Sequence, residues 1–525
     1  MTSADLSSHP ILSIEEAVVL ENRLLAGDPV REWAAIQQAG AGIGAAILAD
    51  FNALRVFPRA PHVLVLCGLG HNGADALIAA EALLQSRPRG IVHVYFALGI
   101  EGLKPLARRA WERLASLENV RVIDPLDFQA HYDIILDGIF GLGSRLPLPE
   151  NVASLLHQVN QAFPLSFKVA VDLPTGLAEG TPSIIFNAGI TYATGSVKSI
   201  LLDAKHAQSV GRLRYIDIGF WKDLQVAEHY HYKPHRVLSP TVLTPLRMLR
   251  DAYADKREYG HALVIAGSAN MPGAALMAAK AALKSGVGRV TVATPHSVCA
   301  MLAGQAPEAM WLSCPQTAIG GISREAKGII DAKLSCMDAL LIGPGLGHDR
   351  DALSLVLHVL ENFSKPIVVD ADALQPEILD AIKKRPRLSA PVILTPHRGE
   401  LARLLKISVE EANAHALSEF SGRYGVIVLL KGAHTRIAIA HRVYNVLAGG
   451  PVLARGGSGD ILAGLMVGLC AQKPDQVHEC VGQAVLWHAL AADYLSHHRG
   501  EVSVTTTELL NTLAPILHEW EDGHL

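Results

Sequence analysis

The segment HVLVLCGLGHNGADALIAA, residues 62–80, passes from a short apolar run through a glycine turn into an alanine-rich helical stretch. This succession is typical of a buried strand, a turn and a helix in a parallel α/β sheet. Gly68, Gly70 and Gly73 stand at the GxGxxG spacing that lets backbone N–H groups approach an anion. The segment therefore predicts an α/β fold with a phosphate-binding turn.

The same alternation of strand and helix patterns continues along the chain in two blocks. Strands are predicted at residues 62–68, 91–97, 120–124, 132–138 and 167–173, and again at 261–267, 289–294, 339–344, 366–372, 391–396 and 424–430. The rhythm lapses over residues 213–249, where His, Tyr and Pro cluster. The sequence therefore predicts two tandem three-layer α/β/α domains, over residues 1–235 and 236–525.

Composition favours an enzyme that acts on small molecules. Of 525 residues, 50% are hydrophobic and only 18% charged, and the net charge of −4 predicts no nucleic-acid partner and no attraction to membranes. The first residues lack a basic start and an apolar core, and no apolar run could span a bilayer. We expect a cytoplasmic protein, and enzymes of this size often form homo-oligomers. The six cysteines show no metal-ligand spacing and are expected to be reduced.

Polar residues follow three predicted strands of the first block. They are Asp137 in LDGIFGLGSRLPLP, Asp172 in AVDLPTGL and Lys198 in TYATGSVKS. Open α/β sheets bind ligands at the carboxyl ends of their strands, so these side chains are expected to share one crevice. The next strand, VHVYFALG at 92–99, offers no acid for a ribose, which disfavours a hydride-transferring dehydrogenase.

The second block contains ARGGSGDILAGLMVGL, residues 454–469, a glycine-rich turn that runs into an apolar helix. The N–H groups of Gly457, Ser458 and Gly459, with the helix dipole, could stabilise a phosphoryl group. Asp460 at the mouth of this turn could take a proton from an attacking hydroxyl. The turn lacks the GK[ST] of a Walker A loop. Further strand ends carry GSANMPGAALMAAKAALKSGVG (267–288), IGPGLG (342–347), VVDADAL (368–374), LTPHRGEL (394–401) and LLKGAHT (429–435).

Residues 10–225 resemble the NAD(P)H-hydrate epimerases, whose pattern combines a glycine-rich loop after a strand with Asp-x-x-x-Gly-x-Gly and Asp-x-Pro-Ser-Gly strand ends. The resemblance implies that Asp172 is catalytic and that a potassium ion is held by Asn72, Asp137 and Thr175. It also implies that the hydrate binds His71, Asn72, Gly73, Ala74, Asp75, Gly141, Gly143 and Asp172. The loop departs from the family: Leu69, His71, Ala74 and Ala76 replace Pro, Asn, Gly and Gly.

Residues 240–520 resemble the ADP- or ATP-dependent NAD(P)H-hydrate dehydratases, a branch of the ribokinase-like fold. The resemblance implies a ribokinase-like second domain, a Rossmann-like first domain, and Asp460 as the base that acts on the hydrate hydroxyl. It places the hydrate at Ala274, Gly345, His397 and Asp460. It places the adenine nucleotide, with Mg²⁺, at Lys431, Gly432, Ala433, His434, Thr435 and Gly459.

Together the two resemblances imply repair of NADHX and NADPHX. The first domain would interconvert the R and S epimers, and the second would dehydrate the S epimer, with ADP giving AMP and phosphate, or with ATP. A ribokinase-like small-molecule kinase with an inactive first domain shares the turn and the aspartate, and stays open as an alternative. A ligand-binding protein without activity is a third possibility.

Overall fold

The computed structural model describes residues 5–25, 27–180, 184–386 and 388–519. The chain forms two compact units, one of residues 9–233 and the other of residues 234–519 together with residues 5–8. The change of unit between Lys233 and Pro234 lies two residues before the boundary expected from sequence.

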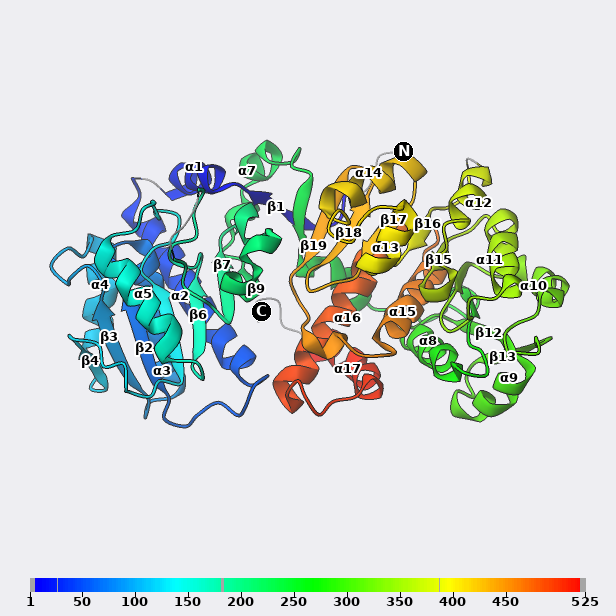
Figure 1. Cartoon of the computed structure of the whole chain (residues 1–525), viewed down its shortest axis with the longest axis horizontal. Coiled ribbons are helices and arrows are strands. Elements are labelled where there is room, and N and C mark those ends of the chain that lie inside the picture. Colours follow the sequence, from blue (N-terminus) through cyan, green and yellow to red (C-terminus); the bar gives the residue numbers. More distant parts are fainter. Residues whose placement is uncertain (1–4, 26, 181–183, 387, 520–525) are drawn as a thin grey trace. The chain divides into compact units, whose positions relative to one another are not determined.

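A parallel sheet forms the centre of the N-terminal unit (Figure 1). Its order is β4-β3-β2-β5-β6-β7-β9. The bounds are β2 His62–Cys67, β3 Ile91–Phe96, β4 Val120–Val122, β5 Ile134–Gly138, β6 Phe167–Val171, β7 Ile190–Thr194 and β9 Arg212–Ile216. The first six strands follow the order of dinucleotide-binding folds, with the reversal between β2 and β5. The Rossmann-like prediction is confirmed.

Helices cover both faces of this sheet because alternate strand residues point to opposite sides. Val63 and Val65 of β2 pack in one core with α2 (Pro29–Phe51), α3 (His71–Ser86) and α4 (Pro105–Ala115). Leu64 and Leu66 pack in the other core, with α5 (Glu150–Ala162). The remaining elements are β1 Ser8–Leu12, α1 Ile14–Leu25, β8 Val197–Lys198, α6 Ala207–Val210 and α7 Leu224–His229. The unit is therefore a three-layer α/β/α sandwich.

The C-terminal unit has a longer sheet of order β13-β12-β11-β14-β15-β16-β17-β18-β19-β10. Its strands are β10 His235–Leu238, β11 His261–Ile265, β12 Arg289–Pro295, β13 Met310–Cys314, β14 Ala339–Ile342, β15 Ile367–Val369, β16 Val392–Leu394, β17 Ile427–Leu430, β18 Thr435–Ile439 and β19 Arg442–Val446. Strand β18 runs antiparallel to β17 and β19, and the other pairs within this unit are parallel. The order reverses between β11 and β14. The predicted α/β class is confirmed here too.

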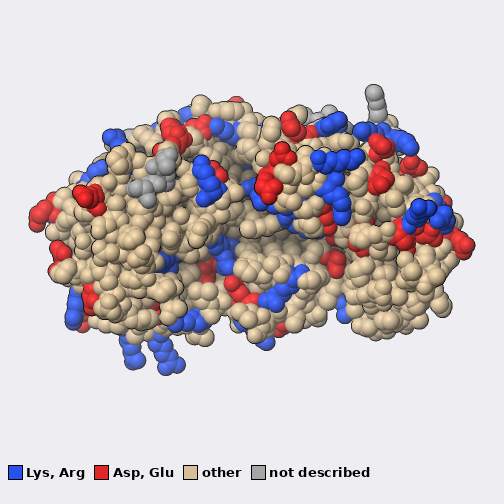
Figure 2. Space-filling model, in the orientation of Figure 1, with Lys and Arg blue, Asp and Glu red and all other residues tan. Residues whose placement is uncertain are grey.

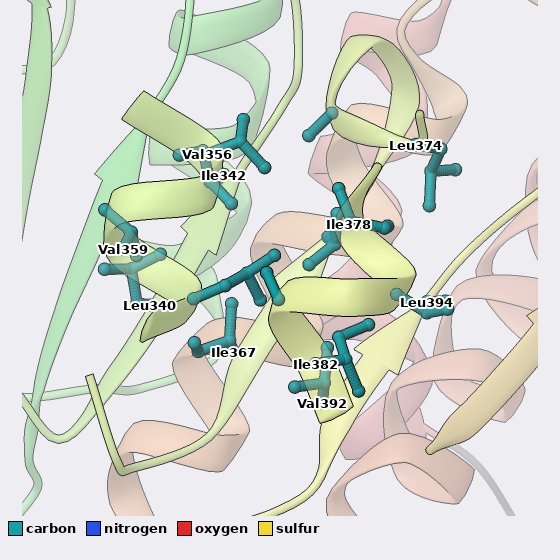
Figure 3. Packing of buried hydrophobic residues seen from close by; sticks show 14 of the residues in the cluster. Leu340, Ile342, Val356, Val359, Ile367, Leu374, Ile378, Ile382, Val392 and Leu394 are labelled. Atoms are coloured by element: carbon teal, nitrogen blue, oxygen red, sulfur yellow. The ribbon is translucent and has the colours of Figure 1, made fainter. Parts of the chain in front are cut away.

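One face of this sheet packs against α10 Lys327–Leu334, α11 Arg350–Asn362, α12 Ile378–Lys384, α13 Arg398–Leu405 and α14 Ala414–Tyr424. Figure 3 shows Leu340 and Ile342 of β14 beside Val356 and Val359 of α11 in this core. The other helices are α8 Pro272–Lys284, α9 His296–Leu302, α15 Ser458–Gln472, α16 Val477–Arg499 and α17 Thr506–Glu519. Of these, α15 packs closely on α8 and carries the glycine-rich turn at its N-terminus.

Two glycines let α15 and α8 approach this closely. A Cβ added to Gly464 would lie 2.2 Å from the carbonyl oxygen of Ala278, and one added to Gly468 would lie 2.1 Å from Oγ of Ser285. These residues, Ala278 and Ser285, belong to α8 or follow its last residue. Glycine at residues 464 and 468 therefore allows α15, the helix that carries Asp460, to pack directly against α8.

We expect Gly464→Ala to lower the free energy of unfolding of the C-terminal unit by about 1–3 kcal/mol, because the added methyl forces the helices apart. Gly328→Ala in α10 is the matched control, since a Cβ there meets nothing within 4 Å. The control should be neutral or stabilise by up to about 1 kcal/mol, as alanine favours a helix. Urea unfolding followed by circular dichroism measures both. Equal urea midpoints for Gly464→Ala and Gly328→Ala would contradict a tight contact between α15 and α8.

Acidic and basic side chains are intermixed on the face shown in Figure 2. Among the helices that the structure describes, none is long and apolar enough to cross a membrane.

Two candidate active sites

The N-terminal candidate site lies at the carboxyl ends of β2 and β5, where the strand order reverses. Ligands of open α/β sheets bind at such a reversal. The resemblance to the epimerases implies a loop over residues 71–75. This expectation is wrong, because α3 already begins at His71, with Gly70 as its N-cap. The turn consists of residues 68–70. Residues 71–75 form the first turn of α3, and the free N–H groups at the N-terminus of a helix favour anions.

Glycine is required once in this turn, at Gly68, and once in the first turn of α3, at Gly73. A Cβ on Gly68 would lie 1.9 Å from the carbonyl oxygen of Ile139, and one on Gly73 would lie 2.4 Å from the carbonyl oxygen of Gly68. The departures from the family at Ala74 and Ala76 fall inside α3, where both side chains are buried and an alanine needs no special backbone angles. The altered residues therefore fit the fold without strain.

Asp137 and Thr175, two of the three residues that the resemblance assigns to potassium, are in direct contact. Thr175 donates from its backbone N–H to Oδ2 of Asp137 (2.7 Å) and from its hydroxyl to Oδ1 (2.6 Å). The Asn72 amide lies against Gly141, where an added Cβ would be 2.9 Å from Oδ1 of Asn72. Burial raises the pKa of Asp137 to about 6, although hydrogen bonds from Thr175 and Ile139 lower it. The carboxylate of Asp137 is thus buried, and the groups that donate hydrogen bonds to it carry no charge.

Asp172 follows β6 and has a φ of 63°, in the left-handed region that non-glycine residues rarely adopt. Its Oδ1 accepts hydrogen bonds from the backbone N–H of Thr194 (3.2 Å) and the Thr194 hydroxyl (3.3 Å), and it forms an ion pair with Lys198. Lys198 is fully buried and also donates to the carbonyl oxygen of Thr194 (3.0 Å). Strained backbone of this kind gathers at functional sites.

Two more carboxyl groups interact electrostatically with Asp172 and Lys198. Asp75 of α3 is 8% exposed, and its Oδ1 is buried without a hydrogen-bond partner. Burial first, and then Asp172 and Glu21, hold the pKa of Asp75 well above its ordinary value. Glu21 of α1 was not predicted from sequence, because an acid on a short amphipathic helix has the pattern of a surface residue. His71 is exposed, with its Nε2 4.0 Å from Glu32, and Gly143 is exposed, with nothing within 4 Å of an added Cβ.

The C-terminal candidate site centres on the turn before α15. Gly457 is the N-cap with a φ of 88°, and Ser458 and Gly459 begin the helix. The turn is anchored by Arg455, whose guanidinium donates to the carbonyl oxygens of Glu501 and Val502, and by the Thr506 hydroxyl, which donates to the carbonyl oxygen of Gly456 (2.7 Å). Arg455 therefore stabilises the turn through contacts with residues 501 and 502.

Charged side chains surround the mouth of this turn. Lys431 donates to Oδ1 of Asp370 (2.8 Å), which also accepts from the hydroxyl of Thr395 (2.6 Å). A Cβ on Gly459 would lie 3.6 Å from Nζ of Lys431 and 3.9 Å from Oδ2 of Asp370. Burial and then Asp370 raise the pKa of Asp460 to about 7, against the opposing charge of Lys431. An aspartate with this pKa can exchange protons near neutral pH.

Gly345 and Ala274, which are assigned to the hydrate, lie where the strand order reverses between β11 and β14. Gly345, with a φ of 64°, follows β14, and an added Cβ would lie 2.9 Å from Cβ of Ala274. His397 pairs with Lys431 in a short parallel bridge, and its Nδ1 accepts from the N–H groups of Gly399 (3.0 Å) and Glu400 (3.3 Å). The imidazole therefore caps α13 and must be unprotonated at Nδ1.

The segment assigned to the adenine nucleotide forms the turn between β17 and β18, from Lys431 to Thr435. Within it, Lys431 is the residue that reaches Gly459 and Asp370. Sequence reasoning quoted Asp370 within VVDADAL (368–374) but assigned it no role, although an acid at the end of an apolar strand is a usable signal. It missed His488 of α16, a fully buried imidazole 3.3 Å from the Ser458 hydroxyl. Burial lowers the pKa of His488 to about 4.

Among the described residues, no group of three or more His, Cys, Asp and Glu side chains could hold a metal ion.

Comparison with known proteins covers both units. A family model described as NAD(P)H-hydrate dehydratase matches residues 262–515, and one described as YjeF-related protein N-terminus matches residues 34–200. The bifunctional NAD(P)H-hydrate repair enzyme Nnr of Moorella thermoacetica is 33% identical over 480 residues, 88% of each chain. That of Gloeobacter violaceus is 34% identical over 502 residues, 94% of each chain.

A solved structure also matches: the ADP/ATP-dependent NAD(P)H-hydrate dehydratase from Bacillus subtilis, co-crystallized with ATP and Mg²⁺. It is 30% identical, with a TM-score of 0.44, and the match covers 52% of this chain and 94% of that one. The full-length relatives, matched across both units at 33–34% identity, decide the assignment. The chain belongs to the family of bifunctional NAD(P)H-hydrate repair enzymes.

Proposed function

We propose that this chain repairs hydrated nicotinamide nucleotides. Its N-terminal unit interconverts R- and S-NAD(P)HX, and its C-terminal unit dehydrates the S epimer with ADP or ATP as phosphoryl donor. The observation that carries the dehydratase half is the position of Asp460, with its raised pKa, at the mouth of a glycine turn beside Lys431 and Asp370.

Dehydration needs a base and a place for a phosphoryl group. Hydroxide is a poor leaving group, so phosphorylation of the hydrate hydroxyl followed by loss of phosphate restores the dihydropyridine ring. In this scheme Asp460 takes the proton of the hydroxyl as it attacks the phosphoryl group. The N–H groups of residues 457–459 and the ammonium of Lys431 stabilise the charge that develops on the phosphoryl oxygens.

Mg²⁺ would supply charge neutralisation between the phosphates. A site that shares the ion with phosphates needs one or two carboxylates from the protein. Asp370 fits this role, because Oδ1 is engaged by Lys431 and Thr395 while Oδ2 faces Gly459.

Potassium fits the cluster of Asn72, Asp137 and Thr175. Asp137 is completely buried and its hydrogen-bond donors are neutral groups, so a monovalent cation would offset its charge. The amide nitrogen of Asn72 is buried without a hydrogen-bond partner. Hydroxyl, amide and carboxylate oxygens are the ligands of hard cations. The ion would order the turn that follows β5 around the substrate.

We expect purified protein with Mg²⁺, K⁺ and either ADP or ATP to restore the full absorbance of reduced nicotinamide from an R/S mixture of NADHX. Both activities are needed, because the R epimer must first be converted to the S epimer. Replacing K⁺ by Li⁺ should leave the fast S phase and slow the R phase, since the smaller ion does not suit the oxygen cluster.

The outcomes of this assay separate the two halves of the proposal. Recovery of only the S fraction in K⁺ would contradict the epimerase half. No recovery with either nucleotide would contradict the whole proposal and favour the small-molecule kinase.

A further inference from the structure

Lys198 is a buried cation in direct contact with the strained Asp172. Its side chain is completely buried, and its ammonium forms an ion pair with Oδ1 of Asp172 and donates to the carbonyl oxygen of Thr194 (3.0 Å). Lys198 ends β8, which follows β7 after two residues, and β7 is the parallel neighbour of β6, after which Asp172 stands. The ion pair therefore joins two successive segments at the carboxyl edge of the sheet.

The segment between β7 and β8 is held on two sides. The carbonyl oxygen of Gly195 accepts hydrogen bonds from the hydroxyl of Tyr215 (3.0 Å) and from Nε1 of Trp221 (3.1 Å). Beyond this segment, β8 pairs in parallel with β1. The backbone that carries Lys198 is thus fixed before and at the residue itself, so its ammonium is held against Asp172.

The hydrogen-bond donors to Asp172 are distributed unevenly between its two oxygens. In the part of the chain that the structure describes, they all reach Oδ1: the backbone N–H of Thr194 (3.2 Å), the hydroxyl of Thr194 (3.3 Å) and the ammonium of Lys198. An ionised carboxylate accepts through both of its oxygens. Oδ2 is therefore the oxygen of Asp172 that is left to accept a proton from a ligand.

Stability alone does not account for this ion pair. Transfer of two charges from water to a protein interior is unfavourable, and apolar side chains of similar volume often stabilise a fold as well or better. Asp172 also has a φ of 63°, which is strained for a residue other than glycine. Both features occur at the carboxyl ends of the strands, where open α/β sheets bind their ligands. Buried charge and backbone strain at this edge together indicate a role in function.

We propose that Lys198 is the positioning residue of the epimerase site. Its ammonium holds Oδ1 of Asp172, maintains the carboxylate in the charged form that accepts a proton, and leaves Oδ2 for the hydrate. A contacting cation favours the charged form of a carboxylate and burial disfavours it, so loss of the ammonium favours the neutral acid, which is no base. Lys198 acts through Asp172 and does not contact the hydrate. This proposal rests on the epimerase activity proposed above.

The test measures conversion of R- to S-NADHX without nucleotide over a range of pH, with the epimers separated by chromatography. We expect Lys198→Met to lower kcat at pH 7 by about 100-fold, because methionine nearly keeps the size of the side chain without its charge. KM should change by less than about threefold. The acid limb of kcat should move up by about one pH unit or more, so the loss becomes smaller as the pH rises. Asp75 and Glu21, the other carboxyl groups that interact electrostatically with the pair, are unchanged in this variant.

Lys168→Met is the matched control, because it makes the same substitution at another buried lysine of the same unit. Lys168 lies in β6 and donates to the carbonyl oxygen of Asn160 (3.0 Å). This variant should epimerise at the unaltered rate and with the unaltered pH profile. Dehydration after addition of Mg²⁺ and ADP reports whether each preparation is intact.

A double variant tests whether Lys198 acts through Asp172, and it does not depend on the folding of Lys198→Met. Asp172→Asn combined with Lys198→Met removes both charges, so no unpaired charge stays buried and the protein should fold at least as well as either single variant. The double variant should epimerise within about threefold of Asp172→Asn alone, because the base is already absent. A double variant slower than Asp172→Asn by about tenfold or more would overturn the positioning role.

Three results with Lys198→Met would also overturn the role of Lys198. They are a kcat within about threefold of the unaltered protein, a raised KM with unchanged kcat, and a loss of equal size at every pH, which would indicate a structural role. Absence of epimerisation by the unaltered protein would instead overturn the epimerase activity itself and, with it, the role of Lys198.

Discussion

Asp460→Asn is expected to lower the turnover number of the dehydratase by roughly 10³- to 10⁴-fold, the upper range for loss of a general base. Asparagine keeps the size of the side chain but cannot accept the proton of the hydroxyl. The turn itself should persist, since Arg455 and Thr506 hold it through backbone carbonyl oxygens that the substitution does not touch. The measurement is the rate of NADH recovery from pure S-NADHX with saturating nucleotide and Mg²⁺.

Asp475→Asn is the matched control, because Asp475 is an exposed acid beyond the other end of the same helix. Epimerisation by the same preparation provides an internal standard. The unaltered enzyme should also lose kcat/KM for the hydrate as the pH falls through about 7, because the base is active only when deprotonated and burial holds the pKa of Asp460 near 7. A variant within about tenfold of the unaltered rate would remove Asp460 from the role of base.

Asp172→Asn is expected to lower epimerisation by roughly 10³-fold while the dehydratase rate stays unchanged. Asparagine is the suitable replacement, because it tolerates the left-handed backbone that Asp172 adopts, whereas alanine would add strain to the loss of charge. The amide cannot take a proton from water, and it leaves the buried ammonium of Lys198 without its ion-pair partner.

The measurement is conversion of R-NADHX with nucleotide omitted, followed by addition of Mg²⁺ and ADP to read the second unit in the same sample. Lys205→Met, which removes an exposed lysine paired with Asp203 on the surface of the same unit, controls for a general change in charge. Normal epimerisation by Asp172→Asn would show that the strained aspartate serves folding rather than chemistry.

Sequence predicted most strands in the middle of the two sheets, because most of them form apolar runs. It also predicted the exposed edge strand β4, and it gave no range for the buried interior strand β7. Strand β13 was missed because it lies at an edge of its sheet and is partly exposed, which breaks the apolar run. Strands β18 and β19 were missed because they form an antiparallel hairpin, which departs from the alternation of strand and helix.

For the sites, the residues that the sequence singles out belong to contiguous motifs or stand at the ends of strands. Asp137 and Thr175 meet because β5 and β6 are neighbouring parallel strands, so residues at their carboxyl ends lie side by side. His488 lies on a helix far from any motif, and only tertiary packing brings it to Ser458, while Glu21 lies on a helix outside every motif as well. A helical glutamate and a helical histidine have no local signal that separates them from ordinary surface or core residues.

The first described residues of the chain belong to the unit that is completed last. Asp5 pairs with Arg442, the backbone carbonyl of Ser7 accepts from Ser239, and Leu6 packs beside Gly482. In ribosomal synthesis these residues emerge early and wait for the last helices before they can dock. In topological terms, the N-terminal unit is thus an insertion within the C-terminal unit. A cut of the chain after residue 233 would separate the C-terminal unit from residues 5–8, which belong to it.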